Sequence, residues 1–135
     1  MWLLSFVVEK YVQSFLNNAE EVLRSFKYYR PWHTIHDISK KAHEIVNLTH
    51  QYGEGWLIPG EVGAFVKDGV PNILCLQPFG CIANHVVAKG VEKRLKMKYP
   101  NLNLLFLDAD AGVSEVNYFN RLYFFANQAK VGMPV

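Results

Sequence analysis

The chain has 135 residues, half of them apolar, and a formal net charge of +2. This length suits one domain with a hydrophobic core, and the composition excludes a disordered chain. The small charge gives no reason to expect nucleic acid or an anionic membrane as a partner. The apolar start, residues 1–8, lacks a basic leader and is too short to span a bilayer, so no membrane association is expected.

Residues 2–28 have the pattern of one long amphipathic helix, with apolar residues three, four or seven positions apart. Its main stripe consists of Leu4, Val8, Tyr11, Phe15, Val22 and Phe26. The first turns are apolar on nearly all sides, because Trp2, Leu3, Phe6 and Val7 lie off that stripe. Either these residues pack into the local core, or the helix packs against a second copy or further sequence. A homo-oligomer formed through this helix is therefore one expectation.

A second helix is expected from a Thr34 cap to about residue 47, with an inward face of Ile38, Ala42, Ile45 and Val46. Three histidines, His36, His43 and His50, are seven positions apart and suggest a metal site. A seven-residue step rises about 10 Å along a helix, which is too far for one ion. We interpret them as a solvated face. A glycine-rich stretch, residues 53–61, then leads into a third helix to about residue 68, with Val62, Phe65 and Val66 inward.

The next segment predicts a strand that ends in a tight turn. Ile73–Leu76 is a run of four apolar residues, as expected for a parallel strand covered on both faces. Pro78 cannot extend a strand ladder, and Gly80 permits a sharp turn. Asn84 suits the N-cap of a helix to about residue 98, whose buried line is Val87, Val91 and Leu95.

A second apolar strand, residues 104–107, completes a strand–helix–strand crossover. The loop after it, residues 108–113, precedes a final helix from a Ser114 cap to about residue 130, with Val116, Phe119, Tyr123 and Ala126 inward. The two strand-end loops should face one another, bringing residues 77–81 near residues 108–115. The predicted fold is a three-layer, Rossmann-like α/β domain with a small parallel sheet. It occupies residues 53–135, follows a helical segment at residues 1–52, and forms one compact domain with it.

Cys81 is the chemically notable residue of the first strand-end loop. It is interpretable as a metal or iron–sulfur ligand, as a nucleophile with His85 as its base, or as a small turn residue. Cys75 lies inside the strand and is expected in the core. The extended segment between the cysteines disfavours a disulfide, so a reduced, cytoplasmic setting is expected. Asp108, Asp110 and Glu115 are compatible with a magnesium or ribose site, or with helix and turn capping.

Three segments carry a resemblance to a known family. They are Gly-Glu-Gly-Trp-Leu at residues 53–57 with Gly60-Glu61, Leu-Gln-Pro-Phe-Gly-Cys at residues 76–81 with Asn84-His85, and Ser-Glu-Val-Asn at residues 114–117 with Asn120-Arg121. In this order they resemble the 2-hydroxyacyl-CoA dehydratase-like segment of the large acyl-CoA dehydratase activase-related (CoA-substrate-specific enzyme activase) proteins. The resemblance spans roughly residues 53–125.

The resemblance implies a role in ATP-driven, low-potential electron transfer through a 4Fe–4S iron–sulfur cluster. Cys81 would be a cluster thiolate, and Gly80 would allow close backbone approach. The cofactor-binding residues that we expect around it are Gln77, Gly80, Asp110, Ser114 and Glu115. No ATP-binding module is present, so the expected partner is the remainder of a larger polypeptide or an ATPase activase module, and the isolated chain should not catalyse a reaction. Two other functions stay open, a cofactor-free structural or interaction domain and a nucleotide- or CoA-binding α/β domain.

Overall fold

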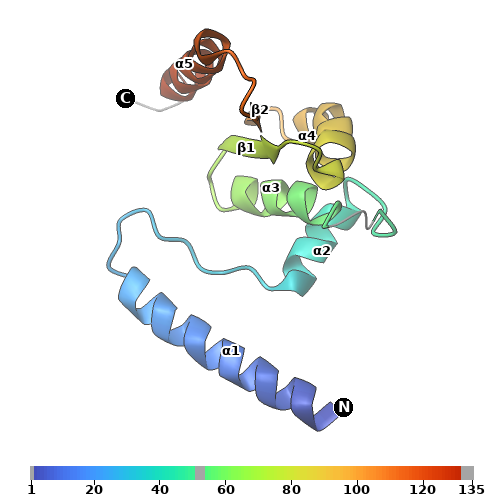
Figure 1. Ribbon diagram of the computed structural model, residues 1–135. Helices are drawn as coiled ribbons and strands as arrows, with labels where there is room; N and C mark the ends of the chain where they lie inside the picture. Colours follow the sequence, from blue (N-terminus) through green and yellow to red (C-terminus); the bar gives the residue numbers. More distant parts are fainter. Residues whose placement is uncertain (1, 51–53, 132–135) are drawn as a thin grey trace. The chain divides into compact units, whose positions relative to one another are not determined.

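The computed structural model describes residues 2–50 and 54–131 (Figure 1). Its contacts divide the chain into two compact units, Met1–Trp32 and His33–Val135. The boundary that the sequence suggests near residue 52 falls within the second unit, among residues outside the described ranges.

The first unit is built on one helix, α1 (Trp2–Leu23). It ends five residues before the predicted position, where the amide of Phe26 donates to the carbonyl of Leu23 in a tight final turn. The predicted apolar stripe is exposed: Leu4 is 70% accessible, Tyr11 76% and Val22 75%. Within this unit, therefore, the stripe is not part of a core.

The second unit begins with a helical pair, α2 (Ile35–His43) and α3 (Leu57–Lys67). The predicted cap is confirmed, because Thr34 Oγ1 accepts from the amide of Asp37 at 3.2 Å. The predicted inward residues of the second helix are all buried, although α2 ends before Ile45 and Val46. A Cβ at Gly60 would lie 2.7 Å from the carbonyl oxygen of Ile38, so only glycine permits this close helix crossing.

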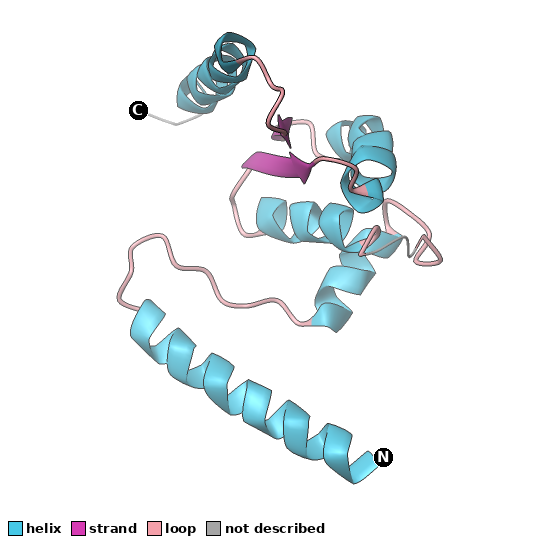
Figure 2. Cartoon of the chain, viewed as in Figure 1, coloured by secondary structure: helices cyan, strands magenta, loops and turns pink. Residues whose placement is uncertain are grey.

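A parallel pair of strands, β1 (Asn72–Pro78) and β2 (Asn103–Ala109), forms the sheet (Figure 2). Its register places Ile73 opposite Leu104 and Gln77 opposite Asp108. One face carries the core, in which Ile73, Leu104 and Phe106 pack with residues of α3 and of the helices between the strands. This confirms the predicted crossover and a mixed α/β fold.

The other face of the sheet is only partly covered, which corrects the prediction that the first strand is buried on both faces. Leu74 is 39% and Leu76 53% accessible, whereas Leu107 of β2 is 1% accessible. Figure 1 shows α5 (Glu115–Val131) on this side of the strands, opposite α3. The reason is that α5 packs along β2, where Asn103 Nδ2 donates to the carbonyl of Phe125 at 3.1 Å, and leaves β1 uncovered.

The helix expected from Asn84 to residue 98 is two elements, a π-helix η1 (Ala83–Ala88) and α4 (Glu92–Lys98). Asn84 therefore lies inside η1 and is not its cap. The predicted buried line is correct, since Val87 and Leu95 are buried and Val91 packs against the core.

The predicted inward face of the last helix is wrong. Val116, Phe119 and Tyr123 are each more than 60% accessible, whereas Tyr118, Leu122 and Phe125 are half-buried. The helix is rotated relative to the prediction because the groups that join it to β2 are on the other face. Among the described residues, no helix is long and apolar enough to cross a membrane.

Candidate functional site at the strand ends

The two strand-end loops meet as predicted, because the parallel register sets Gln77 beside Asp108. After Pro78 the chain turns back on itself: the amide of Cys81 donates to the carbonyl of Pro78 at 3.2 Å. Gly80 has φ of 70°, a left-handed conformation that side chains disfavour. The amide of His85 then donates to the carbonyl of Cys81 at 2.9 Å, which joins the loop directly to η1.

The Cys81 thiol is half-buried at the surface of this loop. Asn84 Nδ2 donates to its sulfur at 3.0 Å. This side-chain hydrogen bond, followed by those from the Asn84 and Ala83 amides, lowers the pKa of Cys81 from its ordinary value and outweighs desolvation. The arrangement favours a thiolate, the form in which cysteine binds metals and attacks electrophiles.

Cys75 has the opposite environment. It packs against the hydrophobic core from β1, and burial, with a smaller contribution from Glu61, raises the pKa of its thiol to about 11. It therefore stays protonated, as expected for the core residue that the sequence indicates.

Gln77 is wholly buried beneath the loop. Its Nε2 donates to the carbonyl of Asn84 at 3.1 Å, while its Oε1 has no hydrogen-bond partner among the described residues. Asn84 in turn donates to the Cys81 sulfur. By holding the Asn84 backbone, Gln77 therefore helps to position the side-chain amide that donates to the thiol. Its place is that of a supporting residue and not of one open to a cofactor.

His85 joins the two strand ends. Its Nε2 lies 3.1 Å from the carbonyl of Pro78, and its Nδ1 lies 3.8 Å from Asp108 Oδ1. Arg121 approaches the other oxygen of this carboxylate at 3.8 Å and donates to the carbonyl of Phe106. Both ring nitrogens of His85 thus face other groups, and in the described part of the chain no hydrogen bond joins the imidazole to the Cys81 thiol. The geometry does not support a nucleophile–base pair.

The second loop has polar residues with local partners. Asp110 Oδ1 accepts from the amide of Gly112 at 3.4 Å, and the Asp110 carbonyl accepts from Val113 at 3.2 Å. The Ser114 carbonyl accepts from the amide of Tyr118 at 2.9 Å and so starts α5, whose first residue is Glu115. These contacts are those of a turn and a helix start, and no specific observation favours nucleotide or CoA at these three exposed side chains.

Two contributors to the site were missed at the level of sequence. Asn84 was interpreted as a helix cap, although its spacing of three residues from Cys81 is the signal that its amide can reach the thiol. The position of Arg121 in a long helix does not indicate which strand end its guanidinium reaches.

The donor atoms at this site suit one metal ligand and not a complete centre. No group of three or more His, Cys, Asp or Glu side chains in the described ranges could hold a metal ion. An iron–sulfur cluster needs about four protein ligands, usually thiolates. Cys81 fits as one of them, whereas Cys75, with its buried and protonated thiol, does not fit as a second.

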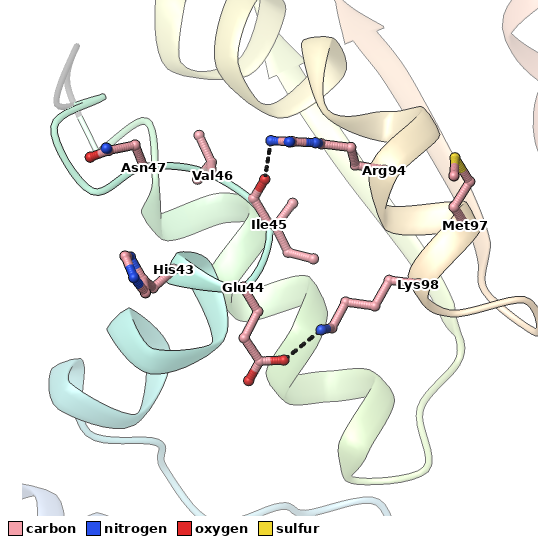
Figure 3. Close-up of a pocket in the computed structure, with 8 residues that line it drawn as sticks. All are labelled: His43, Glu44, Ile45, Val46, Asn47, Arg94, Met97 and Lys98. Atoms are coloured by element: carbon pink, nitrogen blue, oxygen red, sulfur yellow. Dashed lines mark hydrogen bonds and ion pairs between the residues drawn. The ribbon is translucent and has the colours of Figure 1, made fainter.

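A cleft of about 600 Å³ lies away from the Cys81 loop in the second unit, between the end of α2 and α4 (Figure 3). Across it Arg94 donates to the carbonyl of Ile45 at 2.8 Å, and Lys98 pairs with Glu44 at 2.6 Å. Lys98, together with Lys41, lowers the pKa of Glu44 to about 2. These charges are paired with one another across the cleft and hold α4 to α2, so we do not assign it a ligand.

Comparisons with family models, with curated proteins and with solved structures each found no match to this chain. The resemblance described from the sequence therefore stays a prediction.

Proposed function

We propose that this chain contributes the Cys81 thiolate to an iron–sulfur cluster shared with another segment or another chain. The setting would be an activase or 2-hydroxyacyl-CoA dehydratase-like system of ATP-driven, low-potential electron transfer. The observation that carries the proposal is the contrast between the two half-buried cysteines: Asn84 donates to the sulfur of Cys81 and lowers its pKa, whereas desolvation against the core raises the pKa of Cys75.

The surroundings of Cys81 support a ligand role. The thiol lies at the carboxyl end of a parallel strand, and α/β sheets bind ligands beyond the carboxyl ends of their strands. The Asn84 amide stabilises negative charge on the sulfur, which favours the thiolate form that ligates iron. When bound, the cluster would supply one-electron transfer, and this chain would hold one iron through Cys81.

A shared cluster requires ligands in addition to Cys81. In the three-layer, Rossmann-like arrangement that we propose, further strands lie beside β2, so that the other edge of β1 stays open. Additional strands would bring additional strand-end loops to the edge where Cys81 lies, and these are the natural source of the missing ligands. The isolated chain is accordingly proposed to have no catalytic activity of its own.

Anaerobic reconstitution with iron and sulfide tests the proposal on the full chain. Wild type is compared with Cys81→Ser and with Cys75→Ser, the matched control for loss of a thiol. We expect iron binding and the sulfur-to-iron charge-transfer absorption to be lost in Cys81→Ser and retained in Cys75→Ser. Reconstituted wild type should also protect Cys81 from alkylation. A cluster that forms equally well in Cys81→Ser would refute the ligand role.

A structural or interaction module without a cofactor is the second candidate. The observation that favours it is the exposed apolar stripe of α1, which includes Phe15 at 66% accessibility. Replacing Phe15 by lysine should abolish self-association measured by analytical ultracentrifugation, whereas Ser14→Lys, beside the stripe, should not. A chain that is monomeric at all concentrations would contradict homo-oligomer formation through α1.

A further inference from the structure

The groove along the open edge of β1 is the surface with the clearest specific chemistry outside the Cys81 loop. It has a volume of about 300 Å³. Its strand wall is formed by Ile73, Leu74, Cys75 and Leu76, and its helix wall by Ile58, Glu61, Val62 and Phe65 of α3; Asn84 of η1 also lines it. Successive residues of a strand point to opposite faces, so a groove that touches four in succession follows the edge of β1 and not one face.

Among the described residues, no strand pairs with the backbone groups along this edge. β1 pairs with β2 on one side only, and alternate residues of a strand direct their N–H and C=O groups to its other side. Proteins usually protect such edges with charged side chains, bulges or a covering element. The sequence of β1, Asn-Ile-Leu-Cys-Leu-Gln-Pro, contains no charge, and Leu74 and Leu76 are accessible. The edge is therefore competent to pair with another strand.

Glu61 gives the groove a charge preference. No Lys or Arg lies within ion-pair distance of its carboxylate in the described part of the chain, and the nearby His33 is paired with Asp68 at 3.0 Å. Glu61 lines the groove. Although the residue is exposed overall, partial desolvation of its carboxyl group raises its pKa. A ligand that brought a cation to this wall would compensate for the partial desolvation.

We propose that β1 accepts an added β-strand from a different polypeptide, with apolar side chains that enter the groove and a lysine or arginine that pairs with Glu61. Main-chain hydrogen bonds to the edge would supply affinity, and the groove would select the side chains. A second copy of β1 does not fit this description, because β1 carries no cation. The proposal does not require Cys81 to hold a cluster, although the groove shares Asn84 with the Cys81 site.

A capped nine-residue peptide of alternating valine and threonine with a central lysine tests the proposal. Hydrogen exchange of the full chain, measured with increasing peptide, should slow at residues 73–76 and stay unchanged in β2 and α1. Methylation of alternate peptide nitrogens should abolish the effect, since it removes the donors that a ladder needs. A central glutamate should weaken binding roughly tenfold, because it faces Glu61.

Charge reversal in the protein provides the matched control. Glu61→Lys should invert the preference, so that the glutamate peptide binds more tightly than the lysine peptide. Glu9→Lys makes the same change of net charge on α1 and should leave the preference unaltered. Three results would overturn the proposal: no slowed exchange at residues 73–76 up to millimolar lysine peptide, an unchanged preference in Glu61→Lys, or protection of these residues by self-association without peptide.

Discussion

Alkylation should distinguish the two cysteines sharply. With limiting iodoacetamide at pH 8, Cys81 should be modified well before Cys75. The reason is that the reagent attacks thiolates, and the structure places the two thiols in environments with opposite effects on ionisation. Cys75 is also packed against the core, which restricts access to it.

The size of the difference follows from the pKa of Cys75, which burial raises to about 11. At pH 8 such a thiol is ionised in about one molecule in a thousand, whereas a thiol with the ordinary pKa of 9.0 is ionised in about one in eleven. Cys81 lies below its ordinary value and so exceeds that fraction. A more basic thiolate is intrinsically more nucleophilic, which partly offsets the low ionisation of Cys75. The net preference of the reagent for Cys81 should therefore be about tenfold.

The assay is a time course of intact mass and peptide mapping at several pH values. Asn84→Ala removes the amide that donates to the sulfur but keeps the backbone carbonyl that Gln77 holds. It should raise the pKa of Cys81 and move the pH dependence of its alkylation upward, without changing Cys75. Asn120→Ala, in an exposed part of α5, is the control. Equal reaction of both cysteines in native wild type, or an unchanged pH profile in Asn84→Ala, would refute the reasoning.

Packing gives two further predictions, measured by urea unfolding. Gly60→Ala should destabilise the chain by about 1–3 kcal/mol, because its Cβ would lie 2.7 Å from the Ile38 carbonyl; Gly90→Ala, with nothing within 4 Å, should stabilise it by about 0.5–1 kcal/mol. The reverse order would contradict the close crossing of α2 and α3. Leu95→Ala should cost about 2–5 kcal/mol, since this side chain is fully enclosed, whereas Met97→Ala, 73% exposed, should change stability by less than about 0.5 kcal/mol. Equal effects would place Leu95 outside the core.

Local chemistry was readable from the sequence. Thr34 caps α2, Pro78 ends β1 and Gly80 makes the following turn, all as predicted. Each of these depends on the conformations open to a residue and its near neighbours, which the sequence states directly. The juxtaposition of Gln77 with Asp108 was also predictable, because two strands joined by a helical crossover are parallel and end at the same edge.

The faces of the elements were decided by tertiary packing. An apolar run such as Ile73–Leu76 specifies a strand but not what covers each side, and the position of α5 over β2 left half of that strand exposed. The rotation of α5 was likewise set by two hydrogen bonds between α5 and β2. Asn103 of β2 donates to the carbonyl of Phe125, and Arg121 of α5 donates to the carbonyl of Phe106. The pattern of α5 alone is ambiguous, because aromatic residues occur on several sides of the helix.

The sequence by itself determined the order of helical and strand segments along the chain, where the strands end, and that Cys81 follows one of those ends. Only the tertiary structure decided that Asn84 donates to the Cys81 thiol, that Gln77 supports Asn84 from the core, and that Cys75 packs against the core with a raised pKa. The physical reason is the distance along the chain over which each effect acts. Caps and turns are set by adjacent residues, whereas burial and the pKa of a thiol depend on groups that only packing brings together.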